Sequence, residues 1–166
     1  MPSTIGKLKN LRSLLLTECQ RPLSNFDKLP DTIGQLTSLT RLIIDSTILE
    51  SLPNTLGNLK SLVVLRITHN EKLQQLPESI GELNNLRELI ASKNQIISLP
   101  ETIGRLRQLE NLELEYNQLS GLPESIGKLS GLQDDIALYG NPITYLPDGI
   151  LELPVDVVYT SHSCRY

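Results

Sequence analysis

Aromatic and basic residues are scarce in this chain, and each shortage narrows what the protein can be. The 166 residues include no tryptophan, one phenylalanine and five tyrosines, so aliphatic side chains must fill the core. Lysine and arginine number 15 against 19 aspartates and glutamates, which gives a net charge of −4. Nucleic-acid binding needs a clustered basic surface that displaces counterions from phosphates. The composition therefore predicts no nucleic-acid partner.

Long hydrophobic runs are missing as well. No segment reaches the roughly 20 apolar residues that a helix needs to span a bilayer. The N-terminus also lacks the basic start and apolar core of a secretory signal peptide. We expect no membrane span, and either a cytoplasmic protein or a secreted or cell-surface protein whose leader is missing from this sequence.

What the chain has in abundance is a repeat. A Leu-Pro pair recurs at intervals of 23 or 24 residues, and a further copy begins at Met1 with Pro2. Repeats of this length are typical of arrays in which each unit stacks on its neighbours. We therefore expect one elongated domain spanning residues 1–166, with its last repeat acting as a C-terminal cap. The repeats start near residues 1, 29, 52, 76, 99, 122 and 146.

The repeat that spans residues 76–95 shows how one unit is built. Pro77 suits the first position of a short helix, because no backbone N–H is needed there. From Leu89 the apolar period becomes two, as in a strand, with alternate side chains facing inward. Gly81 is predicted to let neighbouring backbones approach closely. Asn94 is predicted to hold the turn after the strand through its buried amide.

The combined pattern LPxxIGxLxxLxxLxLxxN, complete in residues 99–117, resembles the leucine-rich repeat family. The resemblance implies an α/β fold: a right-handed solenoid with a parallel β-sheet on its concave face and short helices or 3₁₀ turns on its convex face. The 23-residue form is similar to that of short bacterial leucine-rich repeat proteins, some of which are exported and bind host proteins. It is also similar to that of intracellular Ras-group proteins. These similarities imply recognition of proteins rather than catalysis.

Departures from the pattern predict local irregularities. The first connection, residues 20–28, is extended. The sixth copy has one residue too many, which predicts a bulge at Asp134 or Asp135. Residues 155–159 are expected to form a closing strand. The strand near residues 14–17 is expected to be an open edge, so that the chain is a fragment or dimerises there.

The side chains between the leucines of each strand are expected to line the concave face. Its first half mixes aliphatic and basic residues, while its second half gathers carboxylates beside two tyrosines. Acidic groups would steer a basic partner, and tyrosine and arginine often anchor interfaces. For any single residue a merely solvated position is the favoured interpretation, but for the face as a whole we predict protein binding. The predicted partner-binding residues are Arg41, Ile43, Arg66, Ile90, Glu113, Glu115, Tyr116 and Tyr139.

Three of the carboxylates raise the possibility of a metal site. Glu113 and Glu115 lie two apart on one strand and point the same way, and Asp135 from the next repeat is expected to join them. Calcium takes roughly six to eight oxygen ligands, to which three carboxylates could contribute. The chain has no recognisable calcium loop, so a plain acidic patch is favoured and calcium remains an alternative. No other cofactor is expected.

The cysteines and histidines indicate no catalytic site. Cys19 and Cys164 lie in the first repeat and in the tail, too far apart for a disulfide. His69 has no nucleophile and carboxylate in a recognisable arrangement, and His162 lies in the polar tail. We therefore predict a protein-interaction module and no enzyme. A bacterial, exported protein that engages a host protein is the first hypothesis; an intracellular Ras-group-like adaptor and a calcium-binding protein are the alternatives, and the oligomeric state is open.

Overall fold

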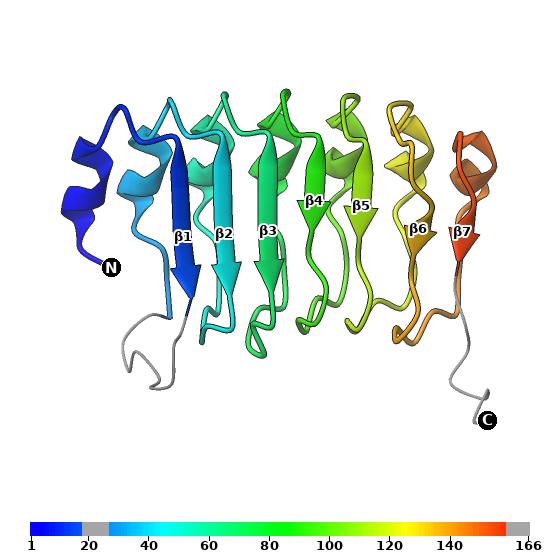
Figure 1. The fold of residues 1–166 in the computed structure, drawn as a ribbon. Helices are drawn as coiled ribbons and strands as arrows, with labels where there is room; N and C mark the ends of the chain where they lie inside the picture. Colours follow the sequence, from blue (N-terminus) through cyan, green and yellow to red (C-terminus); the bar gives the residue numbers. More distant parts are fainter. Residues whose placement is uncertain (18–26, 159–166) are drawn as a thin grey trace.

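Each repeat forms one short helical turn and one strand, and the repeats stack side by side (Figure 1). The structure is a computed structural model that describes residues 1–17 and 27–158. All seven helical segments of these residues are 3₁₀ turns of five residues: η1 (Ser3–Lys7), η2 (Asp31–Gln35), η3 (Asn54–Asn58), η4 (Glu78–Glu82), η5 (Glu101–Arg105), η6 (Glu124–Lys128) and η7 (Asp148–Glu152).

The strands of the described residues form one parallel sheet in the order β1 to β7, with the 3₁₀ turns in a second layer behind it (Figure 1). This arrangement confirms the predicted solenoid. The strands are β1 (Ser13–Thr17), β2 (Arg41–Asp45), β3 (Val64–Thr68), β4 (Glu88–Ile90), β5 (Asn111–Glu113), β6 (Ile136–Ala137) and β7 (Val157–Val158).

The register of the sheet confirms the predicted rows of side chains. Paired residues on neighbouring strands all occupy the same position of their repeats. The outward side of this sheet is called the concave face below, as in the prediction. One row across it reads Leu15, Ile43, Arg66, Ile90, Glu113 and Ala137.

Each 3₁₀ turn begins after a proline, which stands one position earlier than the sequence analysis placed it. Pro77 is the residue before η4, with φ −70° and ψ 149°, and Glu78 is the first helical residue. The extended ψ lets the Pro77 carbonyl accept the first hydrogen bond of the turn, from the Ile80 N–H at 2.9 Å. The missing N–H of the proline costs nothing at this position, because it has no helical partner to lose.

Between the sheet and the turns lies a continuous aliphatic core. Leu83, Leu86 and Leu89 of the fourth repeat are fully buried, and the equivalent leucines of neighbouring repeats pack against them. A buried asparagine follows the strand in four of the repeats. Asn94 is 2% exposed, and it donates to the Ala91 carbonyl of its own repeat at 2.8 Å and to the Ile67 carbonyl of the previous one at 2.7 Å. The predicted role of this asparagine is confirmed. The same position is filled by Asn70, Asn117 and Asn141.

The sixth repeat contains the predicted bulge. The N–H groups of Gln133 and Asp134 both bond to the Glu110 carbonyl, the pattern with which the earlier repeats start their strands. Only three residues later, however, Ala137 pairs with Glu113 of β5. The two registers differ by one residue, so the extra residue lies at 134–135, and β6 is reduced to two residues.

The two ends of the sheet agree in part with the predictions. The strand β1 is the first of the described sheet, and its Leu15 is 61% exposed. The expected closing strand is present as β7, which pairs with β6, although it is limited to Val157–Val158. The extended first connection, both cysteines, His162 and the polar tail lie wholly or largely outside the described residues.

Candidate functional site

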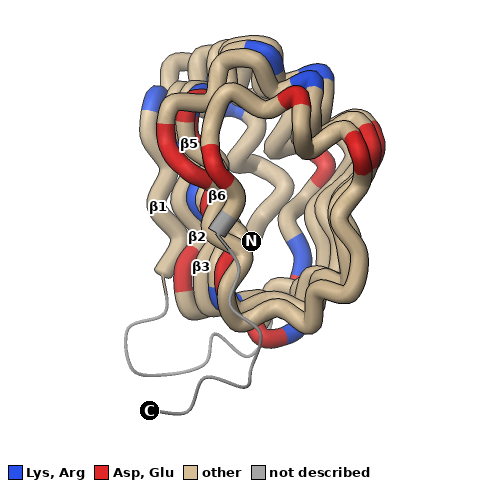
Figure 2. Tube along the Cα trace, turned by 90° about the vertical axis from the view of Figure 1, so that its right-hand side faces the viewer, with Lys and Arg blue, Asp and Glu red and all other residues tan. Residues whose placement is uncertain are grey.

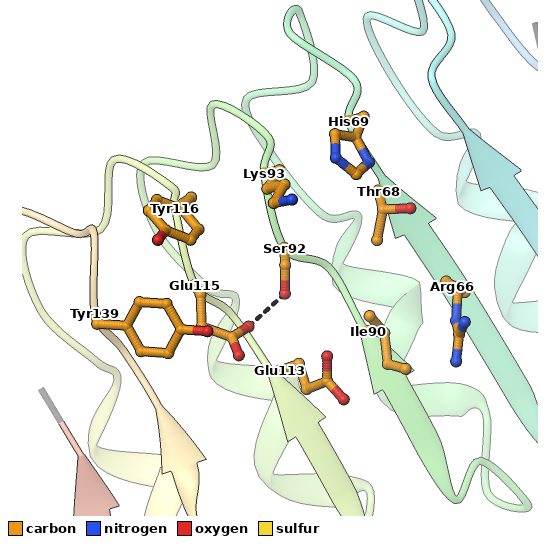
Figure 3. Close-up of a pocket in the computed structure, with 10 residues that line it drawn as sticks. All are labelled: Arg66, Thr68, His69, Ile90, Ser92, Lys93, Glu113, Glu115, Tyr116 and Tyr139. Atoms are coloured by element: carbon orange, nitrogen blue, oxygen red, sulfur yellow. Dashed lines mark hydrogen bonds between the residues drawn. The ribbon is translucent and has the colours of Figure 1, made fainter.

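The concave face carries a hollow of about 460 Å³ over β3 to β6, here called the concave hollow (Figure 3). Six of the eight predicted partner-binding residues line it. Arg41 and Ile43 do not, because they lie on β2 beyond its edge. The residues that line it are Arg66, Thr68, His69, Ile90, Ser92, Lys93, Glu113, Glu115, Tyr116 and Tyr139.

Backbone turns at one repeat position build the rim of the hollow. His69, Lys93 and Tyr116 each have a positive φ of 54° to 58°, a conformation that L-residues adopt at a cost. They immediately precede the buried asparagines, whose hydrogen bonds hold the turn in this shape. The strain therefore places one side chain per repeat along the rim.

Gly140 takes this rim position in the sixth repeat, and it makes room for Tyr116. Its φ is +74°, and a Cβ atom there would lie 2.5 Å from Cδ1 of the Tyr116 ring. Tyr116 also meets Tyr139 edge to face, with ring centroids 5.2 Å apart and planes at 88°. Such a pair is a favourable arrangement of ring quadrupoles. The two tyrosines thus form an ordered aromatic corner at the acidic end of the hollow.

The neighbouring glutamates have different surroundings, which sequence reasoning did not separate. Glu115 is only 9% exposed and accepts a hydrogen bond from the Ser92 hydroxyl (Figure 3). Glu113 is half-buried and accepts from the Asn111 amide at 3.1 Å. Side chains of the adjacent strands cover Glu115, although it belongs to the outward row. Alternation along one strand could not predict that burial.

The charge of Glu115 acts on Tyr139. Its carboxylate raises the pKa of the Tyr139 phenol above the usual value of about 10, with smaller contributions from burial and from Glu113. The phenol group lies beside that carboxylate (Figure 3), and a hydrogen bond between the two side chains also raises the pKa. A negative charge beside the ring disfavours the phenolate, which is why the pKa rises rather than falls.

Replacing Glu115 by glutamine should therefore lower the pKa of Tyr139. The measurement is an alkaline titration of the tyrosine ring carbons by NMR. Tyr145 is an internal control, because the pKa of its phenol is raised by Glu124, outside the hollow, and should not change. An unchanged Tyr139 pKa in the variant would show that Glu115 is not the dominant charge at this ring.

At the basic end, an interaction between Asp45 and His69 escaped the sequence analysis. Asp45 Oδ1 lies 3.0 Å from His69 Nδ1 and accepts a hydrogen bond from the Thr68 hydroxyl at 2.5 Å. Partial burial pushes the pKa of Asp45 up, but these hydrogen bonds and that of Ser46 outweigh it and hold the pKa below its usual value. The sequence could have predicted this contact. Asp45 and Thr68 occupy the same row on neighbouring strands, and His69 directly follows Thr68. No nucleophile among the described residues completes a catalytic triad with them.

Apart from Asp45 and His69, the ion pairs of the described residues lie outside the concave face. On the other surfaces, ion pairs link neighbouring repeats. One of them joins Arg87 to Glu110. Among residues 1–17 and 27–158, no ion pair involves the charged concave residues Arg41, Arg66, Glu88, Glu113 and Glu115. Figure 2 shows charged positions both on the sheet side and on the opposite side of the solenoid.

The structure does not assemble the proposed calcium ligands. In the described part of the chain, no three acidic, histidine or cysteine side chains come together as a metal site. Asp135 accepts a hydrogen bond from the Asp156 N–H at 3.1 Å, towards β7, whereas Glu115 is engaged by Ser92. The bulge before β6 contributes to this, because it disturbs the register between Asp135 and β5.

Comparison with known families identifies the fold. The sequence model described as "Leucine-rich repeat region" matches residues 1–96, which is more than half of the chain. This chain belongs to the leucine-rich repeat family. A second model, "Leucine Rich Repeat", matches residues 108–129. Leucine-rich repeat proteins are generally interaction modules rather than enzymes. A comparison with curated proteins gives no match.

Solved structures of other leucine-rich repeat proteins are similar to this one. The plant peptide hormone receptor RGFR1, in complex with RGF2, is 29% identical with a TM-score of 0.80, over 96% of this chain and 26% of the receptor. A leucine-rich repeat protein of Leptospira interrogans is 33% identical with a TM-score of 0.66, over 95% of this chain and 44% of that one. A chain of the BIR3–SERK2 complex from Arabidopsis thaliana is 27% identical with a TM-score of 0.58, over 78% of this chain and 66% of that one.

This leucine-rich repeat chain is thus shorter than the proteins it resembles. It spans about a quarter of the receptor chain and less than half of the Leptospira chain. In the described residues, no helix has the length and apolar character needed to cross a membrane.

Proposed function

We propose that this chain is a protein-interaction module, without catalytic activity, that binds its partner through the concave face. The observation that carries the proposal is the pairing of charges. Four ion pairs between repeats use charged groups of the other surfaces, whereas the concave residues Arg41, Arg66, Glu88, Glu113 and Glu115 have no ionic partner among the described residues. Asp45 and His69, 3.0 Å apart, are the exception on this face. Unpaired charges of both signs beside two exposed tyrosines are suited to recognition of a complementary surface.

Similar proteins support a recognition role of this kind. RGFR1 was solved with RGF2, and the Arabidopsis structure is a complex of BIR3 with SERK2. Arg41 and Ile43 extend the proposed surface beyond the hollow: Ile43 lies in the row that begins with Leu15, and Arg41 lies in the row that begins with Ser13. The whole proposed surface comprises Arg41, Ile43, Arg66, Ile90, Glu113, Glu115, Tyr116 and Tyr139.

A pull-down with a double variant tests the proposal. The Tyr116→Ala, Tyr139→Ala protein should lose its partner, with binding weakened at least about tenfold. Tyrosine is one of the residue types that most often form interface hot spots, whose truncation costs about 2 kcal/mol or more. The matched control is Tyr145→Ala, since Tyr145 is 57% exposed but lies outside the hollow. Equal capture by the double variant and the wild type would move the binding site away from this end of the face.

For the biological setting, we favour a bacterial protein, exported to engage a host protein, over a Ras-group-like intracellular adaptor. The similarity to the Leptospira protein supports the bacterial setting, because that protein is 33% identical over 95% of this chain, against 29% over 96% for the plant receptor. Fractionation of the native cells tests it: protein at the cell surface or in the medium supports export, and protein held inside the cell supports the adaptor. Calcium is not part of the proposal, because its three predicted ligands do not converge.

A further inference from the structure

We propose that the acidic end of the concave hollow is a subsite for one arginine side chain of the partner protein. This inference rests on the proposed function and specifies what the concave face recognises. Four groups define the subsite: the carboxylates of Glu113 and Glu115, and the rings of Tyr116 and Tyr139 (Figure 3). The subsite is thus both acidic and aromatic, and it opens into the hollow.

The first argument is the uncompensated charge of Glu115. Glu115 is only 9% exposed, and its hydrogen-bond partners in the described chain, the hydroxyl groups of Ser92 and Tyr139, are neutral. Removing a carboxylate from water is unfavourable unless a cation or several donors replace the lost hydration. Two neutral hydroxyl groups replace only part of it. A cation supplied by a partner would restore the rest, and the carboxylate of Glu113 beside it adds to the attraction.

The second argument is that the protein keeps its own cations away from this position. Arg66 is separated from Glu113 by a whole strand, because Ile90 of β4 lies between them in register. Lys93 has a positive φ of 58° and lies on the rim of the hollow. It forms no ion pair among the described residues. The acidic end is therefore not neutralised from within, and Arg66 is left to meet a carboxylate of the same partner.

The third argument concerns the shape of the cation. Glu113 and Glu115 are two residues apart on one side of the chain, so a ligand that reaches both must spread its donors over several ångströms. A guanidinium does this, since its donors form a planar fork that fits carboxylates, and its face packs well on aromatic rings. The rings of Tyr116 and Tyr139, whose planes meet at 88°, line the hollow beside the two carboxylates. A lysine ammonium is a compact charge and would use fewer of these groups.

Titration with three small probes, followed by NMR of the uniformly ¹⁵N-labelled protein, tests this subsite. The probes are N-acetyl-arginine amide, N-acetyl-lysine amide and N-acetyl-citrulline amide, the last being a neutral isostere of arginine. The arginine probe should give saturable shifts of the amides near Glu113, Tyr116 and Tyr139. It should bind at least about fivefold more tightly than the lysine probe, and citrulline should give none. Equal shifts with arginine and citrulline, equal affinity for arginine and lysine, or no saturable shift with arginine would each overturn the proposal.

Variants that remove one charge complete the test. Glu115→Gln keeps the size of the side chain and an oxygen for Ser92, and it should weaken the arginine probe at least about fivefold. Glu113→Gln should act in the same direction, and its partial exposure makes misfolding of little concern. The control is Glu78→Gln, which removes the same charge from the exposed start of η4. If neither hollow variant weakens the arginine probe, the subsite is refuted, whereas loss of the partner in the tyrosine double variant would still support the proposed function.

Discussion

Replacing Gly81 by alanine is expected to destabilise the protein by about 3 kcal/mol or more. A Cβ atom on Gly81 would lie 2.3 Å from the Thr102 carbonyl oxygen and 2.7 Å from the Thr102 Cβ. Both contacts come from η5 of the next repeat, and one of them is with backbone. Relief would require η4 and η5 to move apart, which opens the aliphatic core between them.

This expectation is opposite to that from helix propensity. In an exposed helical turn, alanine is favoured over glycine by roughly 1 kcal/mol. Gly81 does not have a positive φ, so its conformation is open to alanine. A destabilised Gly81→Ala protein would therefore report the close approach of neighbouring repeats and not a demand of the local backbone.

Chemical denaturation followed by circular dichroism measures the effect, and Ser79→Ala is the matched control. Ser79 lies two residues before Gly81 in η4, and its hydroxyl is buried without a hydrogen-bond partner in the described chain. Removing that hydroxyl should leave the unfolding free energy unchanged or slightly higher, since no hydrogen bond is lost. A Gly81→Ala protein as stable as Ser79→Ala would show that the repeats tolerate greater separation than the structure indicates.

The general fold was predictable because the same local choices recur in every repeat. Leucines at fixed positions, a proline before each turn and an asparagine after most strands repeat the same structural information several times, so one misread position does little harm. The register then follows from equivalence, which is why the row from Leu15 to Ala137 was predicted correctly. Even the bulge in the sixth repeat could be predicted, from a single surplus residue.

The candidate site was less predictable, because it depends on differences between repeats. Glu113 and Glu115 look alike in sequence, yet only Glu115 is nearly buried. That burial depends on the side chains that the fourth and sixth repeats place beside it. The expected gathering of Asp135 with them failed for a related reason, since its carboxylate bonds to the Asp156 N–H of the last repeat. The alternation of side chains along a strand predicts which face of the sheet each residue occupies. It does not predict which side chains of neighbouring strands come into contact.

The turn conformations connect the regular fold to the irregular site. The positive φ of Tyr116 is imposed by the repeat, since Ser46, His69 and Lys93 share it. What is particular to the fifth repeat is the choice of tyrosine, together with Gly140 one repeat later to accept its ring. The asparagine that holds each such turn therefore supports the stability of the array and the geometry of the rim at once.

Replacing Asn94 by alanine is accordingly expected to cost about 4 kcal/mol of unfolding free energy. The Asn94 side chain accepts from the Asn70 N–H at 2.9 Å and donates to the Ile67 and Ala91 carbonyls at 2.7 and 2.8 Å. Alanine would leave the Asn70 N–H and the Ile67 carbonyl buried without these partners, and each such loss costs about 1 to 3 kcal/mol. Because both groups belong to the preceding repeat, the loss falls on the contact between two repeats.

Denaturation of Asn94→Ala beside Asn85→Ala isolates that contribution. Asn85 makes one hydrogen bond to the previous repeat, to the Lys60 carbonyl at 2.7 Å, but it is exposed, so water can replace the amide. Its loss should cost no more than about 1 kcal/mol. Stability in a repeat array depends on each contact between neighbours, so the central position of Asn94 should also make unfolding less cooperative. Similar stability of the two variants would mean that the buried asparagines do not hold the repeats together, and that another contact fixes the rim to which Tyr116 belongs.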